Sequence, residues 1–144
     1  MAVNPDFRDL FKIFNEHQVE YLVVGAYAVI YYTVPRYTKD LDIWINPTSE
    51  NADKVWVALE EFGAPLIDIS REDFTDEDVI YQIGIEPNRI DIIMGIPGVR
   101  FPDAWSDREE STFGGIPIYI IGRRHLIQSK RSANRPQDLI DIKN

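Results

Sequence analysis

The sequence predicts an α/β (α+β) domain in which a mixed β-sheet is flanked by helices. Short apolar runs typical of strands alternate with segments whose apolar residues recur at helical spacing. The chain has 144 residues, 44% of them hydrophobic and 12% aromatic, and it shows no repeat, low-complexity tract or linker. This length and composition suit one domain with its own core. We therefore expect residues 1–144 to form a single domain whose C-terminal segment, about 122–144, is helical and basic.

The first two expected elements are a helix and a buried strand. Asn4 is suited to cap a helix whose first turn contains Pro5. Four apolar residues at helical spacing give this helix one face that packs on the core: Phe7, Leu10, Phe11 and Phe14. The run YLVVG predicts a short buried strand that ends at Gly25.

The next three elements lie between that glycine and the middle of the chain. The segment AYAVIYYT fits a helix or a strand, and its alanines and the preceding glycine favour a helix, which Pro35 ends. The run DLDIWI predicts a strand. Residues 49–62 predict a helix with one apolar side, and Gly63 stands at its C-terminal end.

The second half of the chain is expected to contain three strands and several short helices or loops. In order they are an acidic loop or turn (REDFTDEDV), two strands that EPN can join as a hairpin (VIYQIGI and RIDIIMGI), a short helix or loop (FPDAWSDREES), a last strand (IPIYII) and two short C-terminal helices (RRHLIQSKRSA and RPQDLIDIKN).

Composition argues against several classes of protein. No apolar run approaches the ~20 residues of a membrane helix. The N-terminus lacks the basic start and apolar stretch of a secretory signal. There is no cysteine, so a disulfide framework and a thiolate metal site are excluded. We therefore expect a cytoplasmic protein without a membrane partner.

The chain is strongly acidic, and its charged residues are unevenly distributed along the sequence. The net charge of −9 argues against broad, non-specific binding of nucleic acid, which needs lysine and arginine to neutralise phosphates. Residues 50–91 contain twelve acids and three bases, whereas residues 122–135 contain five bases and no acid. The two regions fit two solvated faces, or a site in which carboxylates hold a cation and bases hold phosphate.

Two carboxylates stand unusually close together in the strand DLDIWI. Asp40 and Asp42 are two residues apart, so a regular strand places both on one face about 7 Å apart, where they repel each other. A divalent cation relieves this repulsion, and Mg²⁺ prefers hard oxygen ligands. Asp91 stands alone among isoleucines in the strand RIDII. If the two strands are neighbours, the three carboxylates can hold two metal ions; each acid taken singly also fits a solvent-facing position.

The stretch VVGAYAV combines a strand end, a glycine and a helix start. This order can present backbone N–H groups and the positive end of a helix dipole to a phosphate. Gly25 allows a ligand to approach the backbone closely. An ordinary strand-to-helix turn explains the same pattern.

These motifs together carry a family resemblance. VVGAYAV, DLDIW and RIDII follow one another as in the nucleotidyltransferase superfamily of DNA polymerase β type, which this chain resembles over residues 21 to about 94. The run PRYTKDLDIW and the C-terminal SKRSANRPQDLIDI are similar to small bacterial nucleotidyltransferases of the abortive-infection or toxin–antitoxin kind. The resemblance implies a nucleotidyltransferase-like mixed sheet flanked by helices. One departure is Ala26, where the family has Gly or Ser: it keeps the backbone N–H and loses a hydroxyl.

The resemblance also implies an activity and its residues. Such an enzyme moves a nucleoside monophosphate from an NTP, such as ATP, to an acceptor hydroxyl and releases pyrophosphate, with Mg²⁺ or Mn²⁺ as cofactor. Asp40 and Asp42 would bind the metal shared with the triphosphate, and Asp91 would complete a second metal site and favour deprotonation of the acceptor. The implied nucleotide-binding residues are Gly25, Ala26, Arg36, Thr38 and Lys130.

The acceptor stays open at this stage. An RNA 3′ end such as that of tRNA, a partner protein or a small molecule such as an antibiotic are all compatible with the motifs. The alternative hypothesis is a nucleotidyltransferase-like antitoxin or regulatory module that binds a toxin–antitoxin partner with weak or no catalysis. Because the chain is short, a homo-oligomer or partner is a further expectation. His17 and His125 are expected at the surface, and Trp44 in the core or bordering the pocket.

Overall fold

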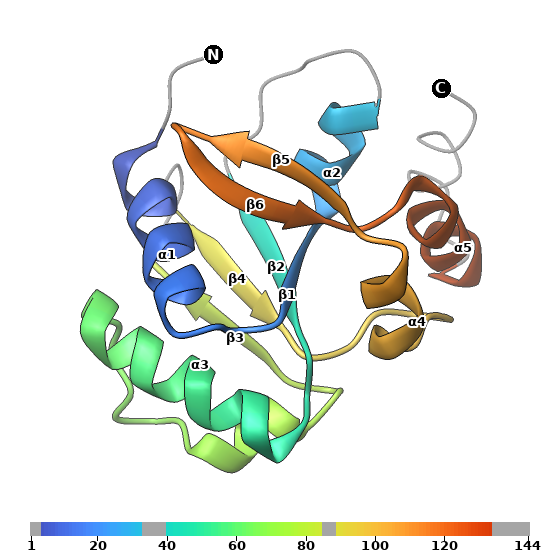
Figure 1. The fold of residues 1–144 in the computed structure, drawn as a ribbon. Helices are drawn as coiled ribbons and strands as arrows, with labels where there is room; N and C mark the ends of the chain where they lie inside the picture. Colours follow the sequence, from blue (N-terminus) through green and yellow to red (C-terminus); the bar gives the residue numbers. More distant parts are fainter. Residues whose placement is uncertain (1–3, 33–39, 85–88, 134–144) are drawn as a thin grey trace.

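A computed structural model describes residues 4–32, 40–84 and 89–133 (Figure 1). In chain order the elements are α1 (Pro5–Glu16), β1 (Tyr21–Val24), α2 (Gly25–Tyr32), β2 (Leu41–Ile45), α3 (Ser49–Phe62), the 3₁₀-helix η1 (Arg71–Thr75), β3 (Ile80–Ile83), β4 (Ile90–Ile93), α4 (Phe101–Ser106), β5 (Glu109–Phe113), β6 (Ile116–Ile120) and α5 (Arg123–Ala133). None of the helices in these ranges is long and apolar enough to span a bilayer.

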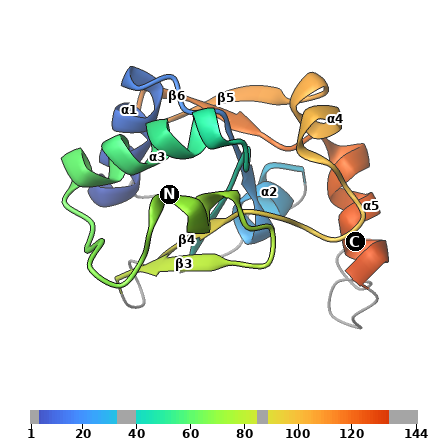
Figure 2. The same cartoon turned by 90° about the horizontal axis from the view of Figure 1, so that it is seen from below.

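The strands form one mixed sheet, which confirms the predicted fold class. Their order is β3-β4-β2-β1-β6-β5. β1 is antiparallel to β2 and parallel to β6, while β4 is parallel to β2 and antiparallel to β3. Helices α1 and α3 lie against each other on one side, and α2 and α5 lie on the other (Figures 1 and 2). The strands that carry the predicted acids, β2 and β4, are therefore neighbours.

The helices of the first side begin and end where their capping residues predict. The Asn4 side chain accepts hydrogen bonds from the backbone N–H groups of Asp6 and Phe7, at 2.9 and 3.3 Å. Thr48 caps α3, and Gly63 ends it with a left-handed φ of 91°. The four apolar residues expected on one face of α1 are all buried: Phe7, Leu10, Phe11 and Phe14. Burying a side chain of this size contributes about 1.5–3 kcal/mol relative to exposing it.

Two segments differ from the sequence prediction. The second part of FPDAWSDREES was expected to be helix or loop, but Glu109 onwards forms the edge strand β5, whose exposed, polar side chains hide the alternation that marks a half-buried strand. The acidic loop at REDFT is a short 3₁₀-helix, with Phe74 buried. The predicted helix end at Pro35 and the second C-terminal helix lie outside the described residues.

Candidate functional site

The site starts from the register of two parallel strands. β2 and β4 pair so that Leu41 lies opposite Ile90 and Asp42 lies opposite Asp91. Neighbouring strands are about 4.8 Å apart, so the two carboxylates are adjacent on the sheet. Asp91 is only 8% exposed. The sequence predicted that Asp91 would face the acids of the first strand if the strands were neighbours, and for Asp42 this is confirmed.

Arg89 is a base in this site that the sequence analysis missed. Its Nη2 donates to Oδ2 of Asp40 at 2.8 Å, and its Nε lies 3.3 Å from Oδ1 of Asp91. The second contact has the distance of an ion pair without the geometry of a hydrogen bond. In the sequence Arg89 is distant from Asp40, but it precedes β4 at the level where Asp40 precedes β2. The backbone bond from Leu41 N–H to the Arg89 carbonyl, 3.1 Å long, joins these two strand starts.

The surroundings of Asp42 disfavour the charged form of its carboxylate. Burial, the charge of Asp91, a hydrogen bond to Asp91 and the charge of Asp40 together raise the pKa of Asp42 to about 7, against the opposing effect of Arg89. Asp42 and Asp91 are adjacent and poorly solvated, and the charge of Arg89 offsets their repulsion only in part. Their oxygens are the ligands that Mg²⁺ and Mn²⁺ prefer, so this pair suits a divalent cation.

Gly25 brings the start of α2 directly against the carboxylate of Asp42. Val24 pairs with Asp42 across β1 and β2, and α2 begins at the next residue. Gly25 has a φ of +68°, and a Cβ built on it would lie 2.1 Å from Oδ2 of Asp42. Only glycine fits here. The strand–glycine–helix motif therefore places a helix start beside the acidic pair.

A pocket of about 430 Å³ joins these elements to α5. Asp42, Gly25 and Ala26 line one part of it, and Ser129 and Lys130 of α5 line another. Its remaining walls are largely apolar: Val24, Ile80, Ile93, Gly95, Ile96, Pro97, Ile121, Leu126 and Ala133. This volume is within the range of roughly 300–1,000 Å³ that is typical of small-molecule sites. Four residues predicted from distant motifs thus border one cavity.

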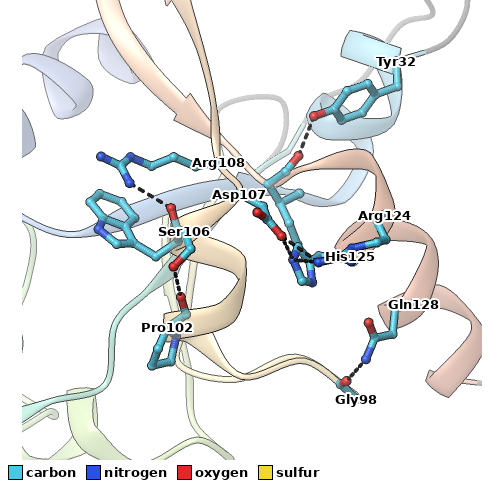
Figure 3. A network of polar contacts seen from close by, with 11 residues as sticks. Tyr32, Gly98, Pro102, Ser106, Asp107, Arg108, Arg124, His125 and Gln128 are labelled. Atoms are coloured by element: carbon cyan, nitrogen blue, oxygen red, sulfur yellow. Dashed lines mark hydrogen bonds and ion pairs between the residues drawn. The ribbon is translucent and has the colours of Figure 1, made fainter.

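A polar network fastens α5 next to this pocket (Figure 3). Nε2 of His125 lies 2.7 Å from Oδ2 of Asp107, and Nη2 of Arg124 lies 2.8 Å from the same oxygen. The hydrogen bond from His125 lowers the pKa of Asp107, and Arg124 adds to the effect. Further along α5, Nε2 of Gln128 donates to the carbonyl of Gly98 at 2.7 Å.

This network corrects one prediction about histidine. His125 was expected at the surface but is only 5% exposed, because its ring anchors the first turn of α5 to Asp107. A single buried histidine at a helix start leaves no periodic signal in the sequence. His17 is partly exposed beside Glu61, as expected.

The other predicted site residues have different positions. Asp40 faces Arg89, and no group of three acidic, histidine or cysteine side chains within the described ranges is placed to hold a metal ion. Trp44 is in the core, where its ring centroid lies 5.0 Å from that of Phe101, and it does not line the pocket. Arg36 and Thr38 lie outside the described residues.

Solved structures with this architecture include three that cover nearly all of the chain. TM1012 from Thermotoga maritima, a candidate nucleotidyltransferase, has 15% identity and a TM-score of 0.63 over 99% of this chain and 93% of its own. The antibiotic-resistance factor ANT(2″)-Ia has 13% identity and a TM-score of 0.62 over 96% of this chain and 80% of its own. The lincosamide antibiotic adenylyltransferase LnuA, solved with lincomycin bound, has 16% identity and a TM-score of 0.58 over 99% and 95%. No protein-family model and no curated protein matches the sequence.

Proposed function

We propose that this chain, which has the nucleotidyltransferase fold, is a metal-dependent enzyme that moves a nucleoside monophosphate from an NTP to an acceptor hydroxyl and releases pyrophosphate. One observation carries the proposal. Asp42 and Asp91 pair in register, and Asp42 opens onto the pocket that Gly25 and Lys130 also line. A carboxylate that faces the cavity with a second one beside it on the sheet, a helix start and a lysine are the groups that a metal-bound triphosphate needs.

Each residue has a role that follows from its chemical group. Asp42 and Asp91, joined by Asp40 once it leaves Arg89, would hold Mg²⁺ or Mn²⁺, which when bound neutralises the developing charge of the transferred phosphoryl group. Backbone N–H groups at Gly25 and Ala26 bind phosphate oxygens at the start of α2. Lys130 contributes a point charge to the triphosphate from α5. Asp91 orients the acceptor hydroxyl and favours loss of its proton.

The acceptor that we favour is a small hydroxyl-bearing molecule, with ATP as the first donor to test. Two of the similar structures are named for antibiotics: LnuA as a lincosamide adenylyltransferase and ANT(2″)-Ia as a resistance factor. The net charge of −9 disfavours a long RNA acceptor. An NTP donor also makes the cytoplasm the expected compartment.

Label transfer from α-³²P-labelled NTPs tests the proposal. Each NTP is incubated with the protein, Mg²⁺ and one of three acceptor mixtures: hydroxyl-bearing antibiotics, total tRNA or a cell lysate. We expect a labelled product that is lost in Asp42→Asn and Asp91→Asn. Asp68→Asn, which changes an exposed acid on the loop after α3, is the matched control and keeps the activity. Product formation that is the same in all four proteins would contradict the assignment.

A second candidate function rests on the contact between Asp40 and Arg89. Because this ion pair keeps Asp40 from the carboxylate pair, the described residues also fit a regulatory module or antitoxin that binds a partner protein with little catalysis. The two functions respond differently to Asp42→Asn: binding to a partner survives the substitution, whereas nucleotide transfer does not. Light scattering of the protein alone and with a captured partner measures whether a homo-oligomer or a complex forms.

A further inference from the structure

Arg89 lies between two carboxylates that the proposed metal site requires. It reaches Asp40 through Nη2 at 2.8 Å and approaches Asp91 through Nε at 3.3 Å. The side chains of Arg89, Asp40 and Asp91 are 32%, 24% and 11% exposed, so the contact is largely shielded from water. Shielding strengthens a charge-assisted hydrogen bond and makes each unpaired charge costly. The guanidinium is therefore part of the site and not a side chain at its rim.

The guanidinium and a divalent ion compete for the same oxygens. Mg²⁺ binds carboxylate oxygens at about 2.0–2.1 Å and accepts little distortion. A divalent ion held by Asp40 and Asp91 would compete with the Arg89 guanidinium for these carboxylates, and two neighbouring cations repel each other strongly where water is scarce. Both cations cannot occupy the site with Arg89 in its present position.

We propose that Arg89 is the resident counter-cation of the metal site: it holds Asp40 and Asp91 in the metal-free protein and leaves them when a divalent ion binds. This inference rests on the proposed function, because it concerns the same three carboxylates. It predicts weak metal binding by the free protein. It also predicts that nucleotide and metal bind together, since a triphosphate brings the ion and offers the released guanidinium a new anionic partner.

Mn²⁺ binding without nucleotide, followed by electron paramagnetic resonance and calorimetry, tests the competition. We expect Arg89→Gln to bind Mn²⁺ about tenfold more tightly than wild type, because the competing charge is gone. Arg89→Lys keeps one charge but loses the fork that reaches both carboxylates, so its affinity falls between the two. Arg71→Gln, which removes an arginine paired with Asp53 at 3.3 Å outside the pocket, is the matched control and binds as wild type does. Equal or weaker Mn²⁺ binding by Arg89→Gln would overturn the inference.

Thermal unfolding gives a second readout that does not depend on activity. In chelator, Arg89→Gln unfolds at a lower temperature than wild type, since Asp40 and Asp91 then lose their ion pairs with the guanidinium. Saturating Mn²⁺ raises its Tm by more than it raises that of wild type. If Arg89→Gln does not fold, the Arg89→Lys comparison decides, and an affinity equal to that of wild type counts against the inference.

Two further outcomes separate this inference from the proposed function. Nucleotide transfer and Mn²⁺ binding by wild type, with no change in affinity in either Arg89 variant, would overturn the inference and leave the function standing. Absence of Mn²⁺ binding in wild type, both Arg89 variants and the control, with or without ATP, would overturn both. Asp42→Asn in the Arg89→Gln background removes the tighter binding if the ion sits where we place it.

Discussion

At the scale of the residue, Gly25 links the backbone to the chemistry of the site. Both its left-handed φ of +68° and the 2.1 Å between a built Cβ and Oδ2 of Asp42 exclude a side chain. We expect Gly25→Ala to lower the free energy of unfolding by about 1–3 kcal/mol and to weaken metal and NTP binding. Urea unfolding and ligand titration measure the two effects.

Gly63 provides a matched control for this substitution. It ends α3 with a φ of +91°, but a Cβ there would meet nothing within 4 Å. Gly63→Ala therefore carries the backbone strain alone and leaves ligand binding as in wild type. Equal losses of stability and of binding in both variants would show that contact with Asp42 has no special cost.

The raised pKa of Asp42 predicts how stability depends on pH. Burial and Asp91 raise it from 3.8 to about 7, with Asp40 adding to the shift and Arg89 opposing it. The folded protein thus keeps this proton up to about pH 7, while the unfolded chain releases it near pH 3.8. The contribution to stability is fully present below that lower value and is lost as pH rises to about 7.

The measurement is urea unfolding across this pH range in the presence of a chelator. Wild type loses stability relative to Asp42→Asn as pH rises through the window, and the difference is constant above it. Parallel pH curves for the two proteins would contradict the cause that we assign to the shift.

The sequence predicted single site residues that belong to a motif. It did not predict residues whose role depends on a contact with a distant part of the chain. Asp42, Asp91 and Gly25 stand in runs whose chemistry is unusual in the sequence itself. Arg89 and His125 gained their roles from partners 49 and 18 residues away. Nothing in their own neighbourhoods distinguishes them from surface bases, so only the pairing of strands and helices could reveal them.

At the scale of the element, α5 supplies the basic wall of the pocket. Lys130 lines the cavity, whereas the next residue, Arg131, is exposed and does not. We expect Lys130→Gln to weaken NTP binding by tenfold or more, since a charge-assisted hydrogen bond is worth about 1.5–3 kcal/mol. Arg131→Gln removes the same charge from the same helix and changes binding little. Titration with a fluorescent NTP compares the two, and equal losses would mean that the helix acts only through its overall charge.

Helices and strands were predictable where their buried faces require hydrophobic residues at regular spacing in the sequence. The faces of α1 and the apolar runs of β1 and β2 pack on one core, so their patterns are clear. The strand β5 is different because it lies at the edge of the sheet and has no fully buried residue. Its register comes from pairing with β6, which its own residues do not encode.

At the scale of the whole molecule, the order of the strands decides what the site can be. The motifs indicated two acidic strands but not that β4 would pair directly with β2, because strand order depends on how the intervening α3, η1 and β3 pack. The sequence therefore predicts the carboxylate pair only on the condition that the two strands are neighbours. The fold then converts two separate motifs into one carboxylate pair.

Net charge acts at this scale on the choice of acceptor. At −9, the molecule repels a polyanion, and within the described part of the chain α5 offers a limited basic surface. We expect gel-shift experiments with total tRNA to show no complex at physiological salt, and any complex at low salt to dissociate steeply as salt rises. A complex that survives physiological salt would point to RNA as the acceptor.

The parallel pairing of β2 with β4 also has a consequence for how the chain folds. β4 reaches its place only after the chain has passed through α3, η1 and β3, and such non-local parallel pairing closes slowly. The same step brings Asp42 against Asp91, so like charges oppose it at neutral pH. Arg89 arrives with β4 and supplies the opposing charge at that moment. A newly synthesised chain can therefore complete its sheet before it meets a metal ion.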